Sequence, residues 1–214
     1  MNYIIETILD LLFPRRCPVC GQIIMPKGNL ICPGCIRKLS WVRGPVCKCC
    51  GKEIISETAE YCSDCAIHPR SFSNGMALLN YNEISAPSLA KIKYHNHREY
   101  LDFYAEAAYR KYAARIARLS PDLIIPVPVH KSRMKKRGFN QAEELGKRLS
   151  HYLEIPMNSS LLIRSKKTVP QKDLGPALRL KNLEQAFSCR KLPYRMKKVL
   201  LIDDIYTTGS TAEA

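Results

Sequence analysis

Eight of the ten cysteines follow one spacing rule that occurs twice in the chain. The rule is C-x2-C-x11-C-x2-C, and its second copy begins thirty residues after the first. Gly21 and Gly51 each follow the second cysteine of a copy. A pattern repeated at a fixed interval indicates a structural unit duplicated in tandem. The two sets are Cys17, Cys20, Cys32 and Cys35, then Cys47, Cys50, Cys62 and Cys65.

This spacing predicts two structural zinc sites. Two thiolates on a tight C-x2-C turn occupy two corners of a tetrahedron, and a second pair closes a four-thiolate site without an open position. The glycine after each first pair relieves strain where the chain turns back under the metal. A redox C-x2-C pair is the alternative, but eight positions that obey one rule favour zinc. We therefore expect two tandem zinc ribbons, which depend on the metal for folding because they lack a core.

Three features of the Cys-rich segment stay open from spacing alone. Cys49 lies outside the rule and is either a spare thiol or a substitute for Cys47 or Cys50. Each ribbon binds its own ion, or the two share ligands crosswise. The module contacts nucleic acid, docks a partner or serves structure alone, and structure alone is the principal expectation.

The composition divides the chain into three parts. Tyr3–Phe13 has apolar residues at helical spacing and is followed by Pro14, so a short N-terminal helix is expected within residues 1–16. The double zinc-ribbon module follows over residues 17–70. Residues 71–214 contain only one cysteine, Cys189, and have the length of a typical domain.

Two continuous apolar runs in the third part indicate buried strands. They are Asp122–Val129, which contains prolines near its end, and Lys197–Asp204, which ends in two acids. Shorter strands are expected at Ser73–Tyr81 and Leu161–Ile163. Patterns typical of helices cover residues 84–94, 98–119, 141–153 and 177–185.

Strands that alternate with helices predict an α/β fold, namely a doubly wound parallel sheet behind the smaller Cys-rich module. Ligands of such sheets bind beyond the C-terminal ends of the strands, where the strand order reverses. The loops at those ends are Val129–Asn140 and Asp203–Thr211. We expect the functional site in these two loops.

The segment Val199–Thr211 carries the strongest chemical signal. A hydrophobic strand delivers two acids, and small hydroxylated residues with a glycine then open a helix. Backbone N–H groups of such a loop bind phosphate, and glycine permits a close approach. Carboxylates suit a sugar diol instead, because they accept hydrogen bonds. The pattern predicts a ribose 5-phosphate pocket formed by Asp203, Asp204, Thr207, Thr208, Gly209, Ser210 and Thr211.

This segment resembles the phosphoribosyl pyrophosphate motif of type I phosphoribosyltransferases. The resemblance implies that Asp203 and Asp204 contact ribose, and that they are catalytic if the protein is an active enzyme. It also implies that residues 207–211 hold the 5-phosphate and that Mg²⁺ bridges pyrophosphate and ribose oxygens. The loop Val129–Arg137 would face the pyrophosphate, with Arg133 and Arg137 among its ligands.

Three further pieces resemble the ComF family, in which an N-terminal zinc module precedes a phosphoribosyltransferase-like domain. They are Pro126–Leu145, Gln171–Phe187 and the paired cysteine runs, and RGFNQA at residues 137–142 is the most distinctive. The resemblance implies four residues that face ligand, which are Arg133, Arg137, Asn140 and Gln141. It places three others on a mobile loop over the site, which are Gln171, Arg179 and Asn182.

The same resemblance implies a role in genetic competence and natural transformation, on incoming single-stranded DNA in the cytoplasm. Two alternatives are an active phosphoribosyltransferase of nucleotide or nucleobase metabolism and a zinc scaffold that docks a DNA-uptake helicase or another uptake protein. The acceptor substrate, turnover and oligomeric state are not encoded in any recognisable motif. After Thr211 only Ala-Glu-Ala remain, where the family has a full helix, so we expect the sequence to end early.

The formal net charge of +15 favours an anionic partner. Residues 131–148 contain seven Lys and Arg, and residues 164–198 contain eleven, which exceeds the need of one small anion. Nucleic acid is the expected partner, and a solvated surface is the alternative. Phe139, Tyr94 and Tyr100 are candidates for stacking on single-stranded bases, although core packing is the simpler role. The expected nucleic-acid contacts are Lys131, Lys135, Lys136, Lys166 and Lys167.

The longest apolar stretch, residues 3–13, contains Glu6 and Asp10 and is too short to span a bilayer. No basic residue precedes it, so it does not have the pattern of a signal peptide. A cytoplasmic protein without a membrane span is therefore expected. A reducing cytosol also favours metal-bound thiols over disulfides.

Overall fold

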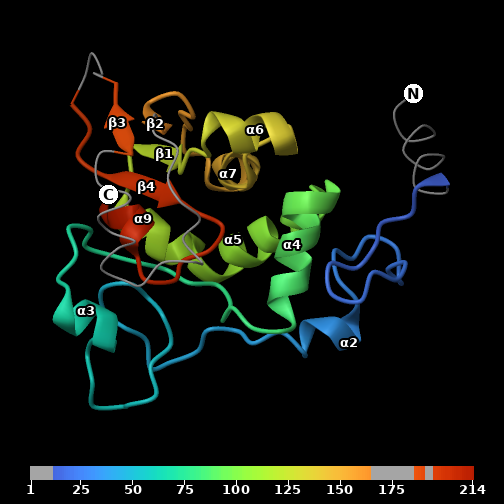
Figure 1. The fold of residues 1–214 in the computed structure, drawn as a ribbon. Helices are drawn as coiled ribbons and strands as arrows, with labels where there is room; N and C mark the ends of the chain where they lie inside the picture. Colours follow the sequence, from blue (N-terminus) through green and yellow to red (C-terminus); the bar gives the residue numbers. More distant parts are fainter. Residues whose placement is uncertain (1–11, 165–185, 191–194) are drawn as a thin grey trace.

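The structure, a computed structural model, describes residues 12–164, 186–190 and 195–214. Within these ranges the chain forms a Cys-rich module of short elements and an α/β unit (Figure 1). Most of the expected N-terminal helix and the whole expected helix at 177–185 lie outside the described residues.

The two cysteine runs fold into the same small unit. In each, the first cysteine donates its N–H to a carbonyl five residues on at 2.8 Å, from Cys17 to Gln22 and from Cys47 to Lys52. Gly21 and Gly51 close these turns with φ values of +75° and +72°, which favour glycine. A short helix then begins after the third cysteine of each run. These helices are α2 (Pro33–Ile36) and α3 (Ser63–Ile67).

The expected strand at Ser73–Tyr81 is wrong. The segment is extended, but it forms a single isolated bridge, between Leu79 and Trp41. The backbone bonds that it makes around this bridge go to the chain leaving the first ribbon, from Val42 N–H to Leu78 and from Asn80 N–H to Ser40. That chain is itself not a strand, so no ladder can propagate.

Three of the expected helices are present almost as predicted. α4 (Ser85–His95) and α5 (Tyr100–Leu119) end at Asn96 and Ser120, both in the left-handed conformation. α7 (Gln141–Leu153) has the predicted bounds. Its amphipathic pattern is strong, and its N-terminal cap is an Asn side chain, so local sequence determines both its face and its start.

The sheet of the α/β unit is built around β1 (Leu123–Pro126). β4 (Val199–Ile202) pairs with it in parallel, with Ile124 opposite Leu200, and Val127 N–H extends the pairing to the Ile202 carbonyl at 2.9 Å. On its other side Ile124 forms a parallel bridge with Met157. The chain order is therefore reversed at β1, because the next extended segment lies on one side and β4 on the other. A separate antiparallel pair joins β2 (Leu162–Arg164) to β3 (Phe187–Cys189). β2 lies one residue beyond the strand expected at Leu161–Ile163, whereas β3 and the pairing were not predicted.

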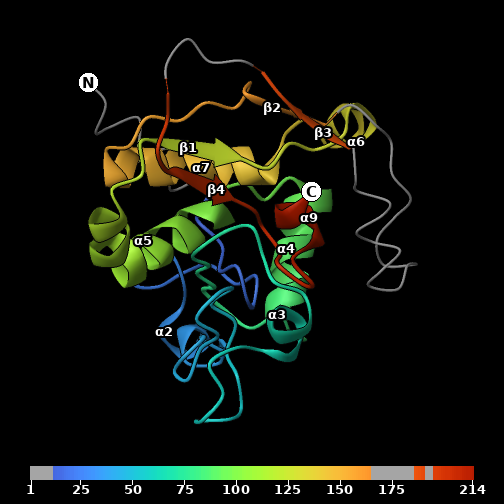
Figure 2. The same cartoon turned by 90° about the vertical axis from the view of Figure 1, so that its left-hand side faces the viewer.

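The two faces of the sheet are covered differently (Figure 2). α5 and α7 pack on the face of Ile124 and Ile202, where Ala105 and Leu149 complete a buried cluster. Leu161 covers the opposite face. The prediction of strands buried on both faces holds for β1 but is wrong for β4, whose Val199 and Leu201 are 42% and 39% exposed. Among the described residues, no helix packs over the side chains of Val199 and Leu201. The mixed α/β architecture is nevertheless confirmed.

The segment expected as a loop after β1 contains a helix, α6 (Lys131–Arg137). The His130 ring accepts a hydrogen bond from the Ser132 N–H at 3.2 Å and caps its start. Gly138 ends it in the left-handed conformation. No residue of α6 is buried, so apolar periodicity, which was the sequence criterion for helices, could not reveal it.

The first ribbon shares a hydrophobic core with the helices of the α/β unit. Ile24, Ile31 and Leu39 pack in one buried cluster with Ile92 of α4 and Leu101 of α5. The second ribbon has its own small cluster around its cysteines. The two copies of one unit are therefore packed against different parts of the molecule.

Candidate functional site

Each cysteine run forms its own four-sulfur cluster. Within each cluster all ligand sulfurs lie within 4.8 Å of one another, and none of the ten cysteines forms a disulfide. Crosswise sharing between the ribbons is thereby resolved in favour of one set for each. Cys49 stays outside both sets and has its sulfur 3.8 Å from the Phe72 carbonyl. The donor set and its closure fit two structural zinc ions.

The pKa values of these thiols fit a four-thiolate site that needs a bound cation to be fully ionised. Despite burial, which opposes ionisation, backbone N–H groups lower the pKa of Cys17 to about 7 and that of Cys47 to about 6. Burial, together with the neighbouring sulfurs of Cys17 and Cys20, raises the pKa of Cys32 to about 12. Such thiols cannot all be thiolates without a positive charge among them. Zinc supplies that charge and binds the deprotonated form.

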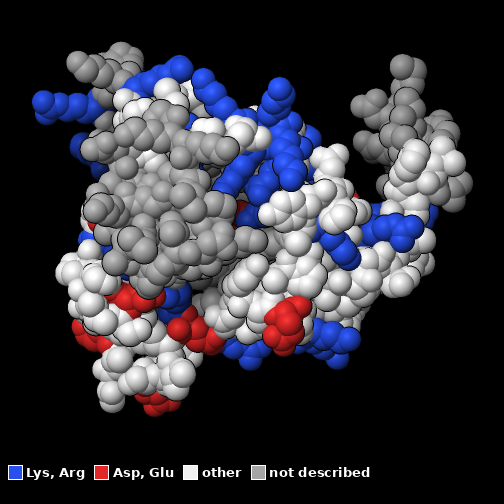
Figure 3. Space-filling model, in the orientation of Figure 1, with Lys and Arg blue, Asp and Glu red and all other residues white. Residues whose placement is uncertain are grey.

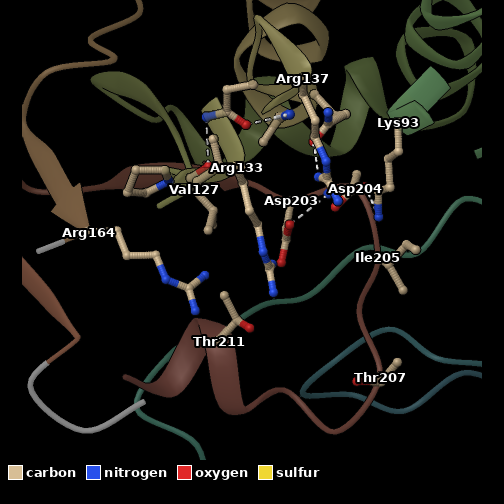
Figure 4. Close-up of a pocket in the computed structure, with 15 residues that line it drawn as sticks. Lys93, Val127, Arg133, Arg137, Arg164, Asp203, Asp204, Ile205, Thr207 and Thr211 are labelled. Atoms are coloured by element: carbon tan, nitrogen blue, oxygen red, sulfur yellow. Dashed lines mark hydrogen bonds and ion pairs between the residues drawn. The ribbon is translucent and has the colours of Figure 1, made fainter. Parts of the chain in front are cut away.

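A pocket of about 190 Å³ lies at the C-terminal ends of β1 and β4. Val127, Pro128 and Val129 continue β1 into its wall, and Asp203 and Asp204 follow β4 directly. This is the place where the strand order reverses, which is the usual ligand position in open α/β sheets. α4, α6, α7 and β2 supply the remaining walls (Figure 4).

Two acids form one side of the pocket. Asp204 N–H donates to the Asp203 carboxylate at 2.8 Å, and the Asp204 carboxylate forms an ion pair with Lys93 of α4. Asp203 opens to the pocket but is surrounded by protein atoms. This desolvation and the adjacent Asp204 charge raise the pKa of Asp203 to about 8. The acid pair therefore favours partners that donate hydrogen bonds or bring positive charge.

The facing side is cationic. Arg133 and Arg137 reach the pocket from α6, and Arg164 reaches it from β2. Figure 4 shows Arg133 and Arg164 both directed toward Thr211. Burial and the nearby Arg133 charge lower the pKa of Arg164. The arrangement concentrates positive charge opposite a hydroxyl-bearing loop, which suits a phosphorylated ligand.

The residues of the RGFNQA motif divide between structure and pocket. Asn140 lines the pocket but uses its side chain within the fold, donating to the Val127 carbonyl at 2.9 Å. Gln141 accepts a hydrogen bond from Arg137 at 3.0 Å, which holds that guanidinium at the pocket wall. The Gln141 side-chain NH₂ is buried without a partner among the described residues. It is therefore an unsatisfied donor in a residue that lines the pocket.

The loop after β4 contributes unevenly. Thr207 and Thr211 line the pocket, whereas the hydroxyls of Thr208 and Ser210 bond to each other at 2.8 Å. Gly209 has φ of +79°. Among the described residues, nothing accepts a hydrogen bond from the N–H groups of Thr208 and Gly209. The loop thus keeps backbone donors free for an anion.

The structure adds two pocket residues that sequence reasoning missed. Lys93 lies in α4 and Arg164 in β2, and neither has a neighbouring motif that marks it. Only the fold brings them to the strand ends. Five of the expected contacts lie outside the described residues, which are Lys166, Lys167, Gln171, Arg179 and Asn182.

A basic surface lies beside the pocket mouth. Figure 3 shows Lys and Arg side chains gathered at the place of α6. Lys131, Lys135 and Lys136 are exposed there, and α6 contains no acidic residue. Tyr94 is 63% exposed nearby, with the Arg137 guanidinium 5.1 Å from its ring centre. The other aromatic candidates, Phe139 and Tyr100, are buried in the core, which agrees with the simpler role of core packing and leaves neither ring available for base stacking.

These features define a class of protein: a double zinc ribbon joined to an α/β unit with a charged pocket at its strand ends. The double zinc ribbon domain model matches residues 8–66. Competence protein F of Haemophilus influenzae is 32% identical over 206 residues, which cover 93% of this chain and 88% of that protein. The chain belongs to the ComF family, as its resemblance predicted.

Further relatives carry related names. Competence protein ComFC of Bacillus subtilis is 26% identical over 88% of this chain and 77% of that protein. DNA utilization protein YhgH of Escherichia coli K12 is 29% identical over 70% of this chain and 67% of that protein. No solved structure matches the chain significantly. No helix among the described residues is both long and apolar enough to cross a membrane.

Proposed function

We propose that this protein takes part in competence and DNA use, and that its pocket binds phosphoribosyl pyrophosphate with Mg²⁺ while incoming single-stranded DNA is handled in the cytoplasm. The role follows the names of its relatives, Competence protein F, ComFC and DNA utilization protein YhgH. The ligand follows from the charges in the pocket. Both parts are testable on the purified chain.

The observation that carries the ligand is that acids and guanidinium groups line one pocket. Asp203 and Asp204 lie at the end of β4, and the guanidinium groups of Arg133 and Arg164 line the same cavity and are directed toward Thr211. A ligand that fits must have hydrogen-bond donors at one end and anionic groups at the other. A sugar diol with phosphates has both.

The assignment of parts follows the same division. Asp203 and Asp204 accept hydrogen bonds from the ribose hydroxyls, and the loop 207–211 donates to the 5-phosphate. Arg133 and Arg137 face the pyrophosphate, and Arg164 adds a third guanidinium. When bound, Mg²⁺ would offset the charge between pyrophosphate and ribose oxygens, held mainly by the ligand and waters.

Turnover by a phosphoribosyltransferase would use this same arrangement. A nitrogen nucleophile would form a bond to the ribose C1 while the C1–O bond to pyrophosphate breaks. The guanidinium groups would then stabilise the leaving pyrophosphate. The acid pair would hold the ribose in place during this exchange, so a variant without it would lose turnover as well as binding.

Calorimetric titration of phosphoribosyl pyrophosphate with Mg²⁺ tests the pocket. The wild-type chain should bind, and a variant with Asp203→Asn and Asp204→Asn should bind at least tenfold more weakly. Glu57→Gln is the matched control, because it also neutralises an acid but is exposed on the second ribbon. No binding to the wild type, or equal binding to the acid-pair variant, would overturn the proposed ligand. Pyrophosphate release with candidate bases or amines then distinguishes an enzyme from a binding protein.

Single-stranded DNA is supported by the surface of α6. Exposed lysines without neighbouring acids attract phosphates, and the exposed Tyr94 ring offers a face for base stacking. Fluorescence anisotropy with a labelled oligothymidine should show binding at low salt that weakens steeply as salt rises. Absence of binding at low salt would contradict this part of the proposal and leave the pocket unaffected.

A further inference from the structure

We propose that the second zinc ribbon positions the pocket loop, and that Lys52 and Arg70 are the positioning residues that transmit zinc binding to ligand binding. The identity of the ligand rests on the proposed function, but the positioning of the loop by the ribbon does not. Among the described residues, the first ribbon makes no corresponding hydrogen bond to this loop, and its core partners are α4 and α5. The two ribbons would then have different tasks.

The ribbon holds the loop by its backbone carbonyls. Lys52 Nζ donates to the Thr207 carbonyl at 3.2 Å, and Arg70 Nη2 donates to the Thr208 carbonyl at 2.8 Å. Lys52 is itself fixed by an ion pair with Asp64 at 2.7 Å. Lys52 lies on the first knuckle of the ribbon and Asp64 lies in α3, between Cys62 and Cys65. Lys52 and its ion-pair partner Asp64 therefore both belong to the second zinc ribbon.

These two hydrogen bonds also orient the donors of the loop. In a planar trans peptide the C=O and the N–H of the next residue point in opposite directions. Because the carbonyls of Thr207 and Thr208 point to the ribbon, the N–H groups of Thr208 and Gly209 point away from it. These are the N–H groups that have no acceptor among the described residues. The ribbon thus presents free backbone donors on the side of the loop opposite to itself.

Side-chain packing adds a second connection. The Tyr206 ring packs in the cluster of the zinc ligands Cys47, Cys50 and Cys65, edge-on to Phe72 at 6.4 Å. A Cβ at position 209 would overlap the Tyr206 hydroxyl. Because the second ribbon fixes the Tyr206 ring, only glycine fits at this position. The chain leaving the ribbon contacts the loop as well, since the Ser71 N–H donates to the Glu213 carboxylate at 3.1 Å.

The consequence is a thermodynamic coupling between the two sites. Zinc orders the second ribbon, and the ordered ribbon fixes the loop that binds phosphate. Coupling between binding sites is reciprocal, so a ligand in the pocket should raise the zinc affinity of the second ribbon by the same factor. The first ribbon should not respond.

The first test removes the two cationic contacts without touching a zinc ligand. Lys52→Gln is conservative for the fold, because the same position of the first ribbon holds Gln22 with the same backbone hydrogen bond. The variant with Lys52→Gln and Arg70→Gln should keep two zinc ions and bind phosphoribosyl pyrophosphate with Mg²⁺ at least tenfold more weakly. The control with Arg37→Gln and Lys38→Gln changes charge equally on the exposed surface of the first ribbon, and its affinity should stay within twofold. Wild-type affinity in the Lys52 and Arg70 variant would overturn the inference.

The second test uses the unmodified chain and zinc as the readout. Amide resonances of Gly21 and Gly51 report the two ribbons separately while a chelator is titrated. Phosphoribosyl pyrophosphate with Mg²⁺ should raise the chelator concentration needed to release zinc from the second ribbon and leave the first unchanged. Equal effects on both ribbons, or none despite bound ligand, would contradict the coupling.

A third measurement separates this inference from the proposed ligand. The amide resonances of Thr208 and Gly209 in the ligand-free chain should shift and broaden in the Lys52 and Arg70 variant. Unchanged resonances would overturn the positioning role whether or not the wild type binds the sugar phosphate. Changed resonances with no wild-type binding would support the positioning role and reject only the ligand.

Discussion

Asn140 joins the start of α7 to the end of β1 by donating from Nδ2 to the Val127 carbonyl at 2.9 Å. Its Oδ1 accepts a hydrogen bond from the Ala142 N–H at 3.1 Å and so caps the helix. The side chain is buried. One amide group therefore fixes the helix that bears Gln141 relative to the strand that opens into the pocket.

Replacing Asn140 by Ala should reduce stability substantially. It removes an N-cap, which contributes about 0.5–2 kcal/mol, and leaves the buried Val127 carbonyl without its partner, which costs about 1–3 kcal/mol. We expect a total loss of about 2–4 kcal/mol in the free energy of unfolding, measured by denaturant titration. Asn158→Ala is the control, because Asn158 accepts similar bonds from Ser160 and Leu161 in a turn that is only half-buried. A loss at Asn140 no greater than at Asn158 would contradict the role of this link.

Local patterns predicted much of this fold, and for identifiable reasons. α7 has the bounds expected from its apolar spacing, and the cysteine sets match the spacing rule because a C-x2-C turn is a local structure. The pocket loop after β4 was predicted because strand, acids and hydroxyls are contiguous in sequence. These features need no knowledge of distant residues.

The features that failed depend on tertiary contacts. Ser73–Tyr81 has the composition of a strand but packs against a chain that offers no ladder. Lys93 and Arg164 carry no local signal, and only the arrangement of α4 and β2 at the strand ends brings them to the pocket. The attachment of the loop to Lys52 and Arg70 spans 155 and 138 residues of sequence, so no motif could reveal it.

Gly146 allows α7 to approach the sheet closely. A Cβ there would lie 2.9 Å from the Met157 sulfur and 3.7 Å from Ile124. Gly146→Ala should change stability by less than about 1 kcal/mol, because the gain in helix propensity offsets a shift of a flexible Met side chain. Gly146→Val should cost about 1–3 kcal/mol, because its methyl groups have no free volume at the strand. Thermal unfolding of both variants, with the exposed His151→Val as a control for β-branching, checks this.

The two ribbons should differ in their effect on overall stability. Cys32→Ser and Cys62→Ser remove the equivalent ligand of each zinc site. Because the first ribbon shares a core with α4 and α5, Cys32→Ser should lower the melting temperature of the whole protein strongly. Cys62→Ser should lose one zinc ion but retain most of the helical signal by circular dichroism. Similar melting temperatures for the two variants would contradict the separate packing of the ribbons.

The lysines of α6 should determine the salt dependence of DNA binding. Lys135 and Lys136 are exposed and point to no acidic partner among the described residues. If both contact phosphates, replacing them with Gln should reduce the slope of log affinity against log salt by about 1.4, since each single-strand phosphate contact contributes about 0.7. Anisotropy titrations at several salt concentrations measure this slope. The control with Lys27→Gln and Lys38→Gln on the first ribbon should keep the wild-type slope, and an equal decrease there would indicate unspecific attraction.

Asp203 should make stability depend on pH in a defined direction. Desolvation by the protein atoms around the pocket and the charge of Asp204 raise its pKa from an ordinary 3.8 to about 8, so the folded chain binds a proton that the unfolded chain releases between these pH values. This group's contribution to stability therefore falls as the pH rises from about 4 to about 8 and is constant above that. The Asn side chain does not titrate, so the Asp203→Asn variant does not lose this stability as the pH rises. Its melting temperature should therefore exceed that of the wild type by an amount that grows from about pH 4 to about pH 8. Melting curves of the wild type, Asp203→Asn and the exposed-site control Glu57→Gln between pH 4 and 9 measure the difference, and a gain that does not change with pH would show that Asp203 titrates normally.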